Sequence, residues 1–167
     1  MRRLGAVLFA AAAFTSALVG AADRGRGTLL RHSDFRPSMI ALTADDRAFL
    51  GYAVDSLPLA QRVDIDDDGI PDVFVVAHAS LCGTGGCPVL LLDGRSGHRL
   101  GEFFGTIAVL EQREHGRAVI QVLSRRDIER TGIETHAFNG LHYRQLGHDL
   151  LGADAMNAWH ERLESRR

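Results

Sequence analysis

Short apolar runs separated by glycine-containing turns fill the chain from Val63 onward. Runs of this length, rich in Val, Ile, Leu and Phe, are typical of β-strands, and the small gaps between them favour an antiparallel meander. The strands predicted on this pattern are Val73–Ala79, Val89–Asp93, Leu100–Phe104, Ile107–Gln112, Ala118–Leu123, Ile133–Phe138 and Leu141–Leu146.

The clearest predicted hairpin turn is Asn139-Gly140. Asn and Gly both tolerate the positive φ angles that a two-residue type I′ turn requires. Such a turn pairs Ala137 with His142 and His136 with Tyr143, which places the two histidines on opposite faces of the sheet. The pattern therefore does not favour a metal site shared by these histidines.

The segment before the strands predicts one helix. Thr43-Ala44-Asp45-Asp46 offers an N-cap followed by acidic residues in the first turn, and apolar residues then recur at helical spacing up to Pro58. We expect a helix over residues 44–56. The preceding residues 22–40 are rich in Arg and lack periodicity, so they predict a loose arm leading into the fold.

A second helix is predicted near the other end of the chain. There, apolar residues share one helical stripe that is expected to pack its Trp onto the sheet. The fold class is therefore α+β: a single domain over residues 41–167, with an antiparallel meander sheet, an N-terminal helix and a C-terminal helix. The residues of the second stripe are Ala155, Met156, Trp159 and Leu163.

The first 21 residues have the pattern of a secretory signal peptide. Arg2 and Arg3 precede the apolar run Leu4–Val19, and Val19-Gly20-Ala21 offers a small-residue cleavage site. The run is interrupted by polar residues and is short for a membrane span, so we expect removal after Ala21 rather than a retained anchor. This predicts a periplasmic or secreted protein.

Composition limits the partners. All 19 basic residues are Arg, and 17 of them remain against 21 Asp and Glu after the expected cleavage, which leaves a net charge of −4. A negative chain of ordinary globular composition disfavours nucleic acid and anionic lipid as partners. The sequence also lacks the glycine-rich nucleotide-binding motifs and the nucleophile-elbow pattern.

The most specific chemistry lies in the loop Asp64-Ile65-Asp66-Asp67-Asp68-Gly69-Ile70-Pro71-Asp72. It sets carboxylates at positions 1, 3, 5 and 9 and a glycine at position 6, and Ca²⁺ prefers 6 to 8 oxygen ligands. Without an ion, these like charges are expected to raise one another's pKa values. The alternative is an acidic, solvated turn before a strand. The predicted ligands are the side chains of Asp64, Asp66, Asp68 and Asp72 and the carbonyl of Ile70, with Asp67 directed to solvent.

The loop does not follow the EF-hand, because position 12 is Val75 rather than Glu. A D-x-D-x-D-G-x-x-D loop followed by a strand instead resembles the calcium loops of FG-GAP repeats, found in integrin-type β-propellers and many bacterial secreted proteins. The resemblance covers residues 62–76 and implies that the aspartates bind Ca²⁺. Because the loop occurs once, a complete propeller is not expected.

The only two cysteines, Cys82 and Cys87, enclose Gly83-Thr84-Gly85-Gly86. In an oxidising compartment this spacing predicts a disulfide. A redox-active pair and a zinc site completed by His78 and His98 remain as alternatives. Together with the acidic loop and a Phe-Asn-Gly-x-x-Tyr hairpin, the pair also resembles a group of small exported bacterial proteins to which no activity is attached.

These features favour an exported, noncatalytic calcium-binding domain that acts as a structural or binding module. Its expected partner is another protein or an envelope component. One alternative is a periplasmic enzyme inhibitor of the immunity type, which would insert the disulfide-closed Cys82–Cys87 loop into an enzyme. The other is a Ca²⁺-dependent hydrolase that uses the acidic residues.

Overall fold

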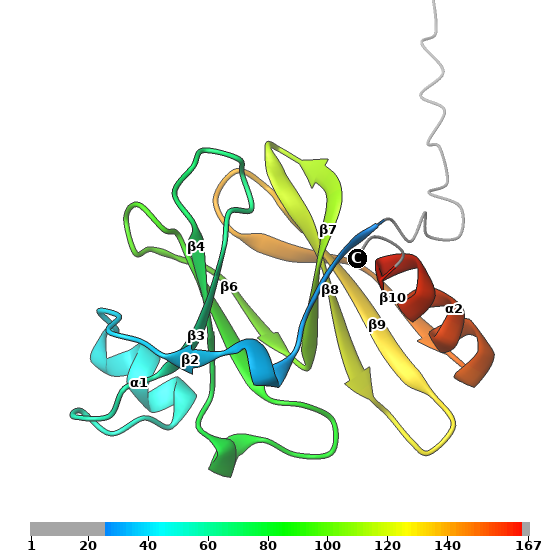
Figure 1. Ribbon diagram of the computed structural model, residues 1–167, viewed down its shortest axis with the longest axis horizontal. Coiled ribbons are helices and arrows are strands. Elements are labelled where there is room, and N and C mark those ends of the chain that lie inside the picture. The colour runs from blue at the N-terminus through cyan, green and yellow to red at the C-terminus, as the bar shows by residue number, and fades with distance from the viewer. Residues whose placement is uncertain (1–25, 165–167) are drawn as a thin grey trace, which may run out of the picture.

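The computed structural model describes residues 26–164, which form two five-stranded antiparallel sheets and two α-helices (Figure 1). The first sheet has the order β2 (Arg36–Pro37), β3 (Leu59–Val63), β4 (Asp72–Val76), β5 (Pro88–Leu92) and β6 (Arg99–Phe104). The second sheet has the order β1 (Gly27–Leu30), β7 (Thr106–Glu114), β8 (Arg117–Arg125), β9 (Thr131–Phe138) and β10 (Tyr143–Leu151). The helices are α1 (Ala44–Leu50) and α2 (Ala153–Glu164), and short 3₁₀ turns occupy His32–Asp34 (η1) and Ala79–Leu81 (η2).

The layers follow from strands that are apolar on both faces. Every residue of β4 is buried, so this strand needs a covering layer on each side. The inner faces of the two sheets share one core, in which Phe74 and Leu91 of the first sheet join Ile120 of the second. Hydrophobic burial of this kind contributes about 25 cal/mol per Å² of apolar surface.

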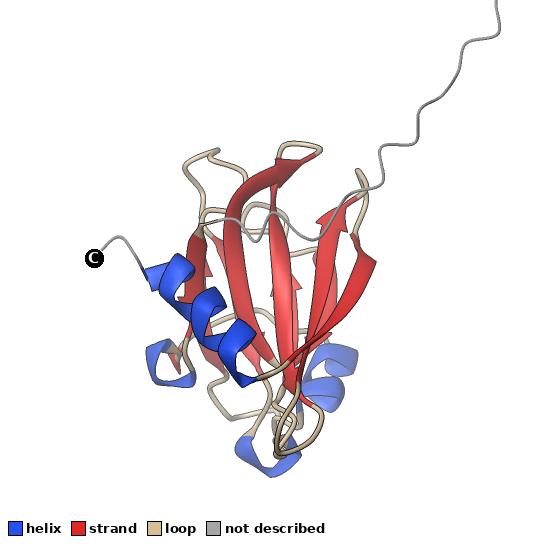
Figure 2. Cartoon of the chain, turned by 90° about the vertical axis from the view of Figure 1, so that its right-hand side faces the viewer, coloured by secondary structure: helices blue, strands red, loops and turns tan. Residues whose placement is uncertain are grey.

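A helix covers each outer face. Leu50 at the end of α1 packs with Val75 and Leu90 of the first sheet. Trp159 of α2 is fully buried against the second sheet, and its indole N–H donates to Gln121 Oε1 at 2.8 Å. Figure 2 shows α2 lying across the strands that it covers.

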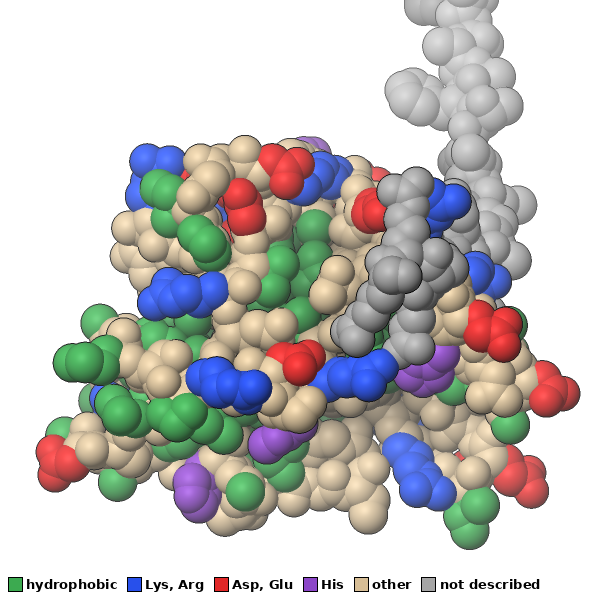
Figure 3. Space-filling model, in the orientation of Figure 1, with side chains coloured by type: hydrophobic (Ala, Val, Ile, Leu, Met, Phe, Trp, Pro, Cys, Tyr) green, Lys and Arg blue, Asp and Glu red, His purple; other side chains and the backbone are tan. Residues whose placement is uncertain are grey.

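Exposed hydrophobic side chains gather near α1. Met39 and Val54 are 90% and 80% exposed, and Leu57 is also largely exposed. In the space-filling view, hydrophobic side chains are concentrated at the lower left, over this helix (Figure 3). Met39, Val54 and Leu57 therefore leave an exposed hydrophobic patch in the loops beside α1.

The chain passes from the first sheet to the second at Gly105, between β6 and β7. Its φ is 146°, and a Cβ built on it would lie 2.2 Å from the carbonyl oxygen of Leu123. The Gly105 N–H donates to the Cys87 carbonyl at 2.9 Å. Only glycine fits this crossing, because any side chain meets backbone that cannot move aside.

The α+β class, the antiparallel strands and the two helices agree with the sequence analysis, but a single sheet was expected and there are two. The predicted loose arm is also wrong for residues 26–40. Within it, β1 pairs with β7 and β2 pairs with β3. The predicted signal peptide lies outside the described residues.

The predicted N-terminal helix begins at the expected residue but ends early, at Leu50 rather than near residue 56. Gly51 adopts the left-handed conformation with φ 71° and donates its N–H to the Ala48 carbonyl. This is a helix C-cap, so the apolar spacing that continues beyond it does not extend the helix.

The Asn139-Gly140 hairpin forms, but not through a two-residue turn. Tyr143 pairs with Phe138, so four residues make the connection, and Asn139 does not adopt a positive φ. The Asn139 side-chain oxygen accepts hydrogen bonds from the amides of Leu141 and His142 at 3.0 and 2.9 Å. This Asx-type turn competes with the type I′ turn and shifts the pairing by two residues, so that Ala137 pairs with Arg144 rather than with His142.

The Gly105 crossing yields a first prediction. Gly105→Ala is expected to lower the free energy of unfolding by about 3 kcal/mol, because it adds both steric overlap and backbone strain. Gly152→Ala is the matched control, since its Cβ meets nothing within 4 Å. Urea denaturation of both variants measures the effect, and equal stabilities would contradict it.

Candidate metal centre

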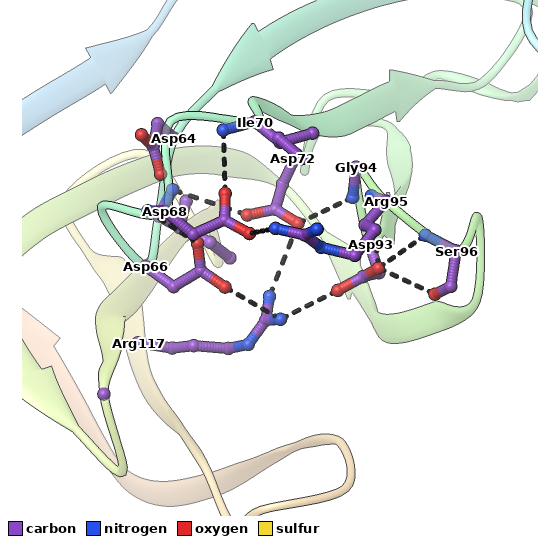
Figure 4. Close-up of polar contacts among 12 residues, drawn as sticks. Asp64, Asp66, Asp68, Ile70, Asp72, Asp93, Gly94, Arg95, Ser96 and Arg117 are labelled. Carbon is purple, nitrogen blue, oxygen red and sulfur yellow. Dashed lines mark hydrogen bonds and ion pairs between the residues drawn. The ribbon is translucent and has the colours of Figure 1, made fainter.

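The loop between β3 and β4 brings three carboxylates together. One oxygen from each of Asp64, Asp66 and Asp68 lies within 4.8 Å of the others (Figure 4). The backbone turns through left-handed conformations at Asp67, with φ 59°, and at Gly69, with φ 81°. These two reversals direct the alternate side chains to one side of the loop, as the spacing predicts.

Hydrogen bonds within the loop hold these side chains in place. Asp64 Oδ2 accepts from the Gly69 N–H at 2.9 Å, and Asp68 Oδ1 accepts from the Ile70 N–H at 2.7 Å. Asp66 Oδ1 accepts from the Asp68 N–H over a longer 3.4 Å. The carboxylates are therefore oriented by backbone donors before any other ligand is considered.

Ile65 anchors the loop to the second sheet. Its side chain is fully buried in the inner core. Its carbonyl accepts from the Ala118 N–H at 2.7 Å and from Arg113 Nη1 at 2.6 Å, both from the β7–β8 hairpin. The acidic loop connects β3 to β4 along the chain, and through Ile65 it also contacts the second sheet.

Arginines from outside the loop pair with most of its acids. Arg117, largely buried on β8, lies 3.0 Å from Asp66 Oδ2 and 3.4 Å from Asp72 Oδ1, and it donates to Asp93 Oδ2 at 2.8 Å (Figure 4). Its buried guanidinium is therefore shared by three carboxylates. Such charge-assisted contacts are strongest where water is excluded.

The other two arginine pairs are more exposed. Arg95 donates to Asp68 Oδ2 at 2.8 Å, and Arg113 lies 2.5 Å from Asp67 Oδ1. Asp67 is 72% exposed, in line with its predicted position toward solvent. Exposed ion pairs contribute little to stability, so these contacts can be exchanged at low cost.

Asp64 differs from its neighbours. Its Oδ1 atom is buried and has no hydrogen-bond partner within the described part of the chain. Burying a carboxylate oxygen without a partner is unfavourable, because the hydration it gives up is not replaced. Asp64 Oδ1 is therefore free to accept a hydrogen bond or to bind a cation.

Asp72 lies outside the group of three, although the sequence also predicts it as a ligand. Only 2% of it is exposed, and it accepts from the Gly94 N–H at 2.9 Å and from the Ile65 N–H at 3.4 Å. Burial raises the pKa of Asp72, against the lowering effect of the Gly94 hydrogen bond and of Arg117. Its contacts tie the end of the loop to the β5–β6 turn.

The expectation that crowded aspartates raise one another's pKa does not hold for Asp68. The hydrogen bond from Arg95, with a further one from the Ile70 amide, lowers the pKa of Asp68. The arginines were missed because Arg95 lies in the β5–β6 turn and Arg117 on β8, and a sequence gives no distance between either residue and the loop. The mutual repulsion was therefore overestimated.

Asp93 is a further residue of this site that sequence reasoning missed. Burial raises its pKa, but hydrogen bonds from the Ser96 hydroxyl and amide and from Arg117 outweigh burial and hold the pKa of Asp93 at about 2. In the sequence Asp93 stands as the last residue of the predicted strand Val89–Asp93. The Asp93 carboxylate is one of the three that contact the Arg117 guanidinium.

The disulfide between Cys82 and Cys87 is confirmed, with a Cα–Cα distance of 4.2 Å. Gly83 and Gly86 exchange backbone hydrogen bonds of 2.8 and 3.1 Å inside the ring. Because both sulfurs form the disulfide, neither is free as a thiolate for the alternative zinc site. His78, which that alternative required, instead places Nδ1 2.8 Å from Ser80 Oγ.

Comparison of the chain with protein-family models, with curated proteins and with solved structures finds no match. The likeness to FG-GAP loops therefore rests on the acidic loop itself. Over residues 26–164, neither helix is long and apolar enough to cross a membrane.

The Arg117 network predicts how stability depends on pH. Because the pKa of Asp93 is lowered in the folded state, the stability that it contributes is present above the unfolded pKa near 3.8 and is lost as the pH falls toward 2. Asp93→Asn should reduce the free energy of unfolding by about 2 kcal/mol at pH 7, and this difference from the wild type should shrink toward zero at pH 2.

Urea denaturation between pH 2 and pH 7 measures this difference. Asp55→Asn is the control, because Asp55 is exposed and remote from the network in sequence. A difference between wild type and Asp93→Asn that stays constant over this pH range would contradict the assignment.

Proposed function

We propose that this protein is an exported, noncatalytic calcium-binding domain, in which the ion fixes the β3–β4 loop and the domain serves as a structural or binding module. The observation that carries the proposal is the convergence of Asp64, Asp66 and Asp68 within 4.8 Å, together with the buried, unpartnered Asp64 Oδ1. A cation at this position removes the cost of that orphaned oxygen.

The donor set favours Ca²⁺ over other ions. The group contains carboxylate oxygens and neither histidine nor thiolate, which are the ligands that zinc prefers. Ca²⁺ accepts 6 to 8 oxygens in flexible geometry, so three carboxylates and the proposed Ile70 carbonyl can be supplemented by water. Asp72 supports the loop through the Ile65 and Gly94 amides.

The arginine contacts are compatible with ion binding. The Arg95 side chain is 67% exposed, so a cation can displace it from Asp68 with little loss. Arg117 contacts Asp66 through Oδ2 and is retained by Asp93 on its other side. The loop therefore has a defined shape without the ion and gains a further cross-link when the ion binds.

Export is supported by two features. The N-terminal sequence has the order of a signal peptide, and a disulfide closes the Cys82–Cys87 ring. We place the protein in the periplasm or outside the cell on these grounds.

A groove of about 510 Å³ offers a surface for the proposed partner, a protein or an envelope component. It is bordered by the hairpin Gly83–Gly86, by residues of the β8–β9 connection and by the start of α2. Glycine-rich backbone leaves its amide and carbonyl groups accessible to a partner. The disulfide holds that border of the groove in shape.

The calcium proposal is tested by thermal melts in chelator, in Mg²⁺ and in graded Ca²⁺. Ca²⁺ that binds only the folded state should raise the melting temperature, and a concentration 100 times the dissociation constant should add about 2.7 kcal/mol to the free energy of unfolding. Asp64→Asn should abolish this gain, because it removes the charge and retains an oxygen that can accept from Gly69.

Asp55→Asn serves as the control and should respond to Ca²⁺ as the wild type does. An unchanged melting temperature at millimolar Ca²⁺ would show that the loop is an acidic turn stabilised by arginines alone. A gain that survives Asp64→Asn would place the ion elsewhere.

A further inference from the structure

His32 lies beside the disulfide, although almost fifty residues separate it from Cys82. One of its ring nitrogens and the two sulfurs of Cys82 and Cys87 all lie within 4.8 Å of one another. His32 is exposed, and both cysteines are partly exposed, so small molecules can reach the sulfurs. Unlike His78 and His98, which lie within about sixteen residues of the cysteines in sequence, His32 reaches them only through the fold.

The fold holds His32 at this place. It belongs to η1, the short turn that carries the chain from β1 in the second sheet to β2 in the first. Leu30 before it and Phe35 after it are buried in the inner core, and the Phe35 N–H donates to the His32 carbonyl. Anchors on both sides therefore limit how far the imidazole can move from the sulfurs.

This arrangement has a chemical consequence for the disulfide. Exchange begins when a thiolate attacks one sulfur, and the other sulfur leaves as a thiolate. A neighbouring imidazolium stabilises that thiolate or protonates it, as at reactive cysteines that are paired with histidine.

We propose that Cys82–Cys87 is an exchange-active disulfide, that its reductant is a thiol such as glutathione or a protein dithiol, and that the His32 imidazolium stabilises the thiolate of the leaving sulfur. The attacking thiolate forms a mixed disulfide with one cysteine while the Cys82–Cys87 bond breaks. The released thiolate forms an ion pair with the His32 imidazolium, and solvent supplies the proton of the final thiol. A second thiol then cleaves the mixed disulfide, giving two protein thiols and one oxidised disulfide of the reductant.

The segment Cys82–Cys87 keeps a shape that favours re-formation of the disulfide after reduction. The paired hydrogen bonds between Gly83 and Gly86 lie inside the six-residue segment and do not depend on the sulfur–sulfur bond. They keep the two cysteines close after reduction, which raises the effective concentration of one thiol at the other. The reduced form can therefore return to the disulfide without refolding of the domain.

This site is separate from the acidic loop. The hairpin follows the carboxyl end of β4, whereas the aspartates precede its amino end, and the two lie at opposite ends of the structure (Figure 1). Exchange at the disulfide is therefore expected whether or not Ca²⁺ is bound, and the two proposals can fail independently.

The test uses the oxidised protein in glutathione redox buffers at pH 7, with the dithiol fraction measured by alkylation and mass spectrometry. His32→Gln should lower the equilibrium constant for reduction about tenfold, which corresponds to a potential more negative by about 30 mV, and should slow reduction by dithiothreitol about tenfold. His32→Arg restores a cation and should bring the equilibrium constant back toward that of the wild type.

His98→Gln, at an exposed histidine on the β5–β6 turn, is the matched control and should leave both quantities unchanged. The oxidised His32→Gln protein should melt at the wild-type temperature, which separates a chemical effect from a structural one. The proposal is overturned if His32→Gln matches the wild type in potential and rate, or if the disulfide of the folded protein resists millimolar dithiothreitol.

Discussion

Strands that are apolar on both faces determine how this molecule is layered. A strand such as β4, buried at every residue, cannot lie at a surface, so the first sheet needs the second sheet on one side and α1 on the other. The same holds for β8, which is covered by the first sheet and by α2. In antiparallel order, alternate turns then meet at one end, which brings the β3–β4 loop, the β5–β6 turn and the β7–β8 hairpin together.

Because these turns lie together, arginines of one sheet can offset the negative charge of the acidic loop of the other. Its aspartates come from the first sheet, and Arg113 and Arg117 come from the second, so the ion pairs also connect the sheets. Burial and arginine contacts act in opposite directions on neighbouring carboxyl groups, raising the pKa of Asp72 and lowering that of Asp68. A cation would enter a site whose charge is already partly neutralised.

Local signals in the sequence predicted local structure well. Apolar runs located seven of the ten described strands, β4 to β10, and the spacing of Cys82 and Cys87 predicted their disulfide. The aspartate spacing predicted four converging side chains, of which Asp64, Asp66 and Asp68 come together. These features depend on residues close in sequence, where backbone geometry leaves few alternatives.

The features that were missed depend on distant contacts. Gly105 is an ordinary turn residue in the sequence, and only the packing against Leu123 shows that it moves the chain between sheets. Likewise, β1 has only four residues, GTLL, and is too short to be recognised without its partner β7. Arg117 and His32 acquire their roles only from neighbours that the fold supplies.

The pairing of β1 with β7 and the packing of α2 beside it have a consequence for how the chain acquires its structure. Leu29 of β1 and Trp159 of α2 contribute to the same outer core, so this layer joins the two ends of the described chain. Contacts between such distant segments form late, because the loop between them must close first. Under the proposed export, this topology implies that stable folding waits until translocation has delivered both segments to the same compartment.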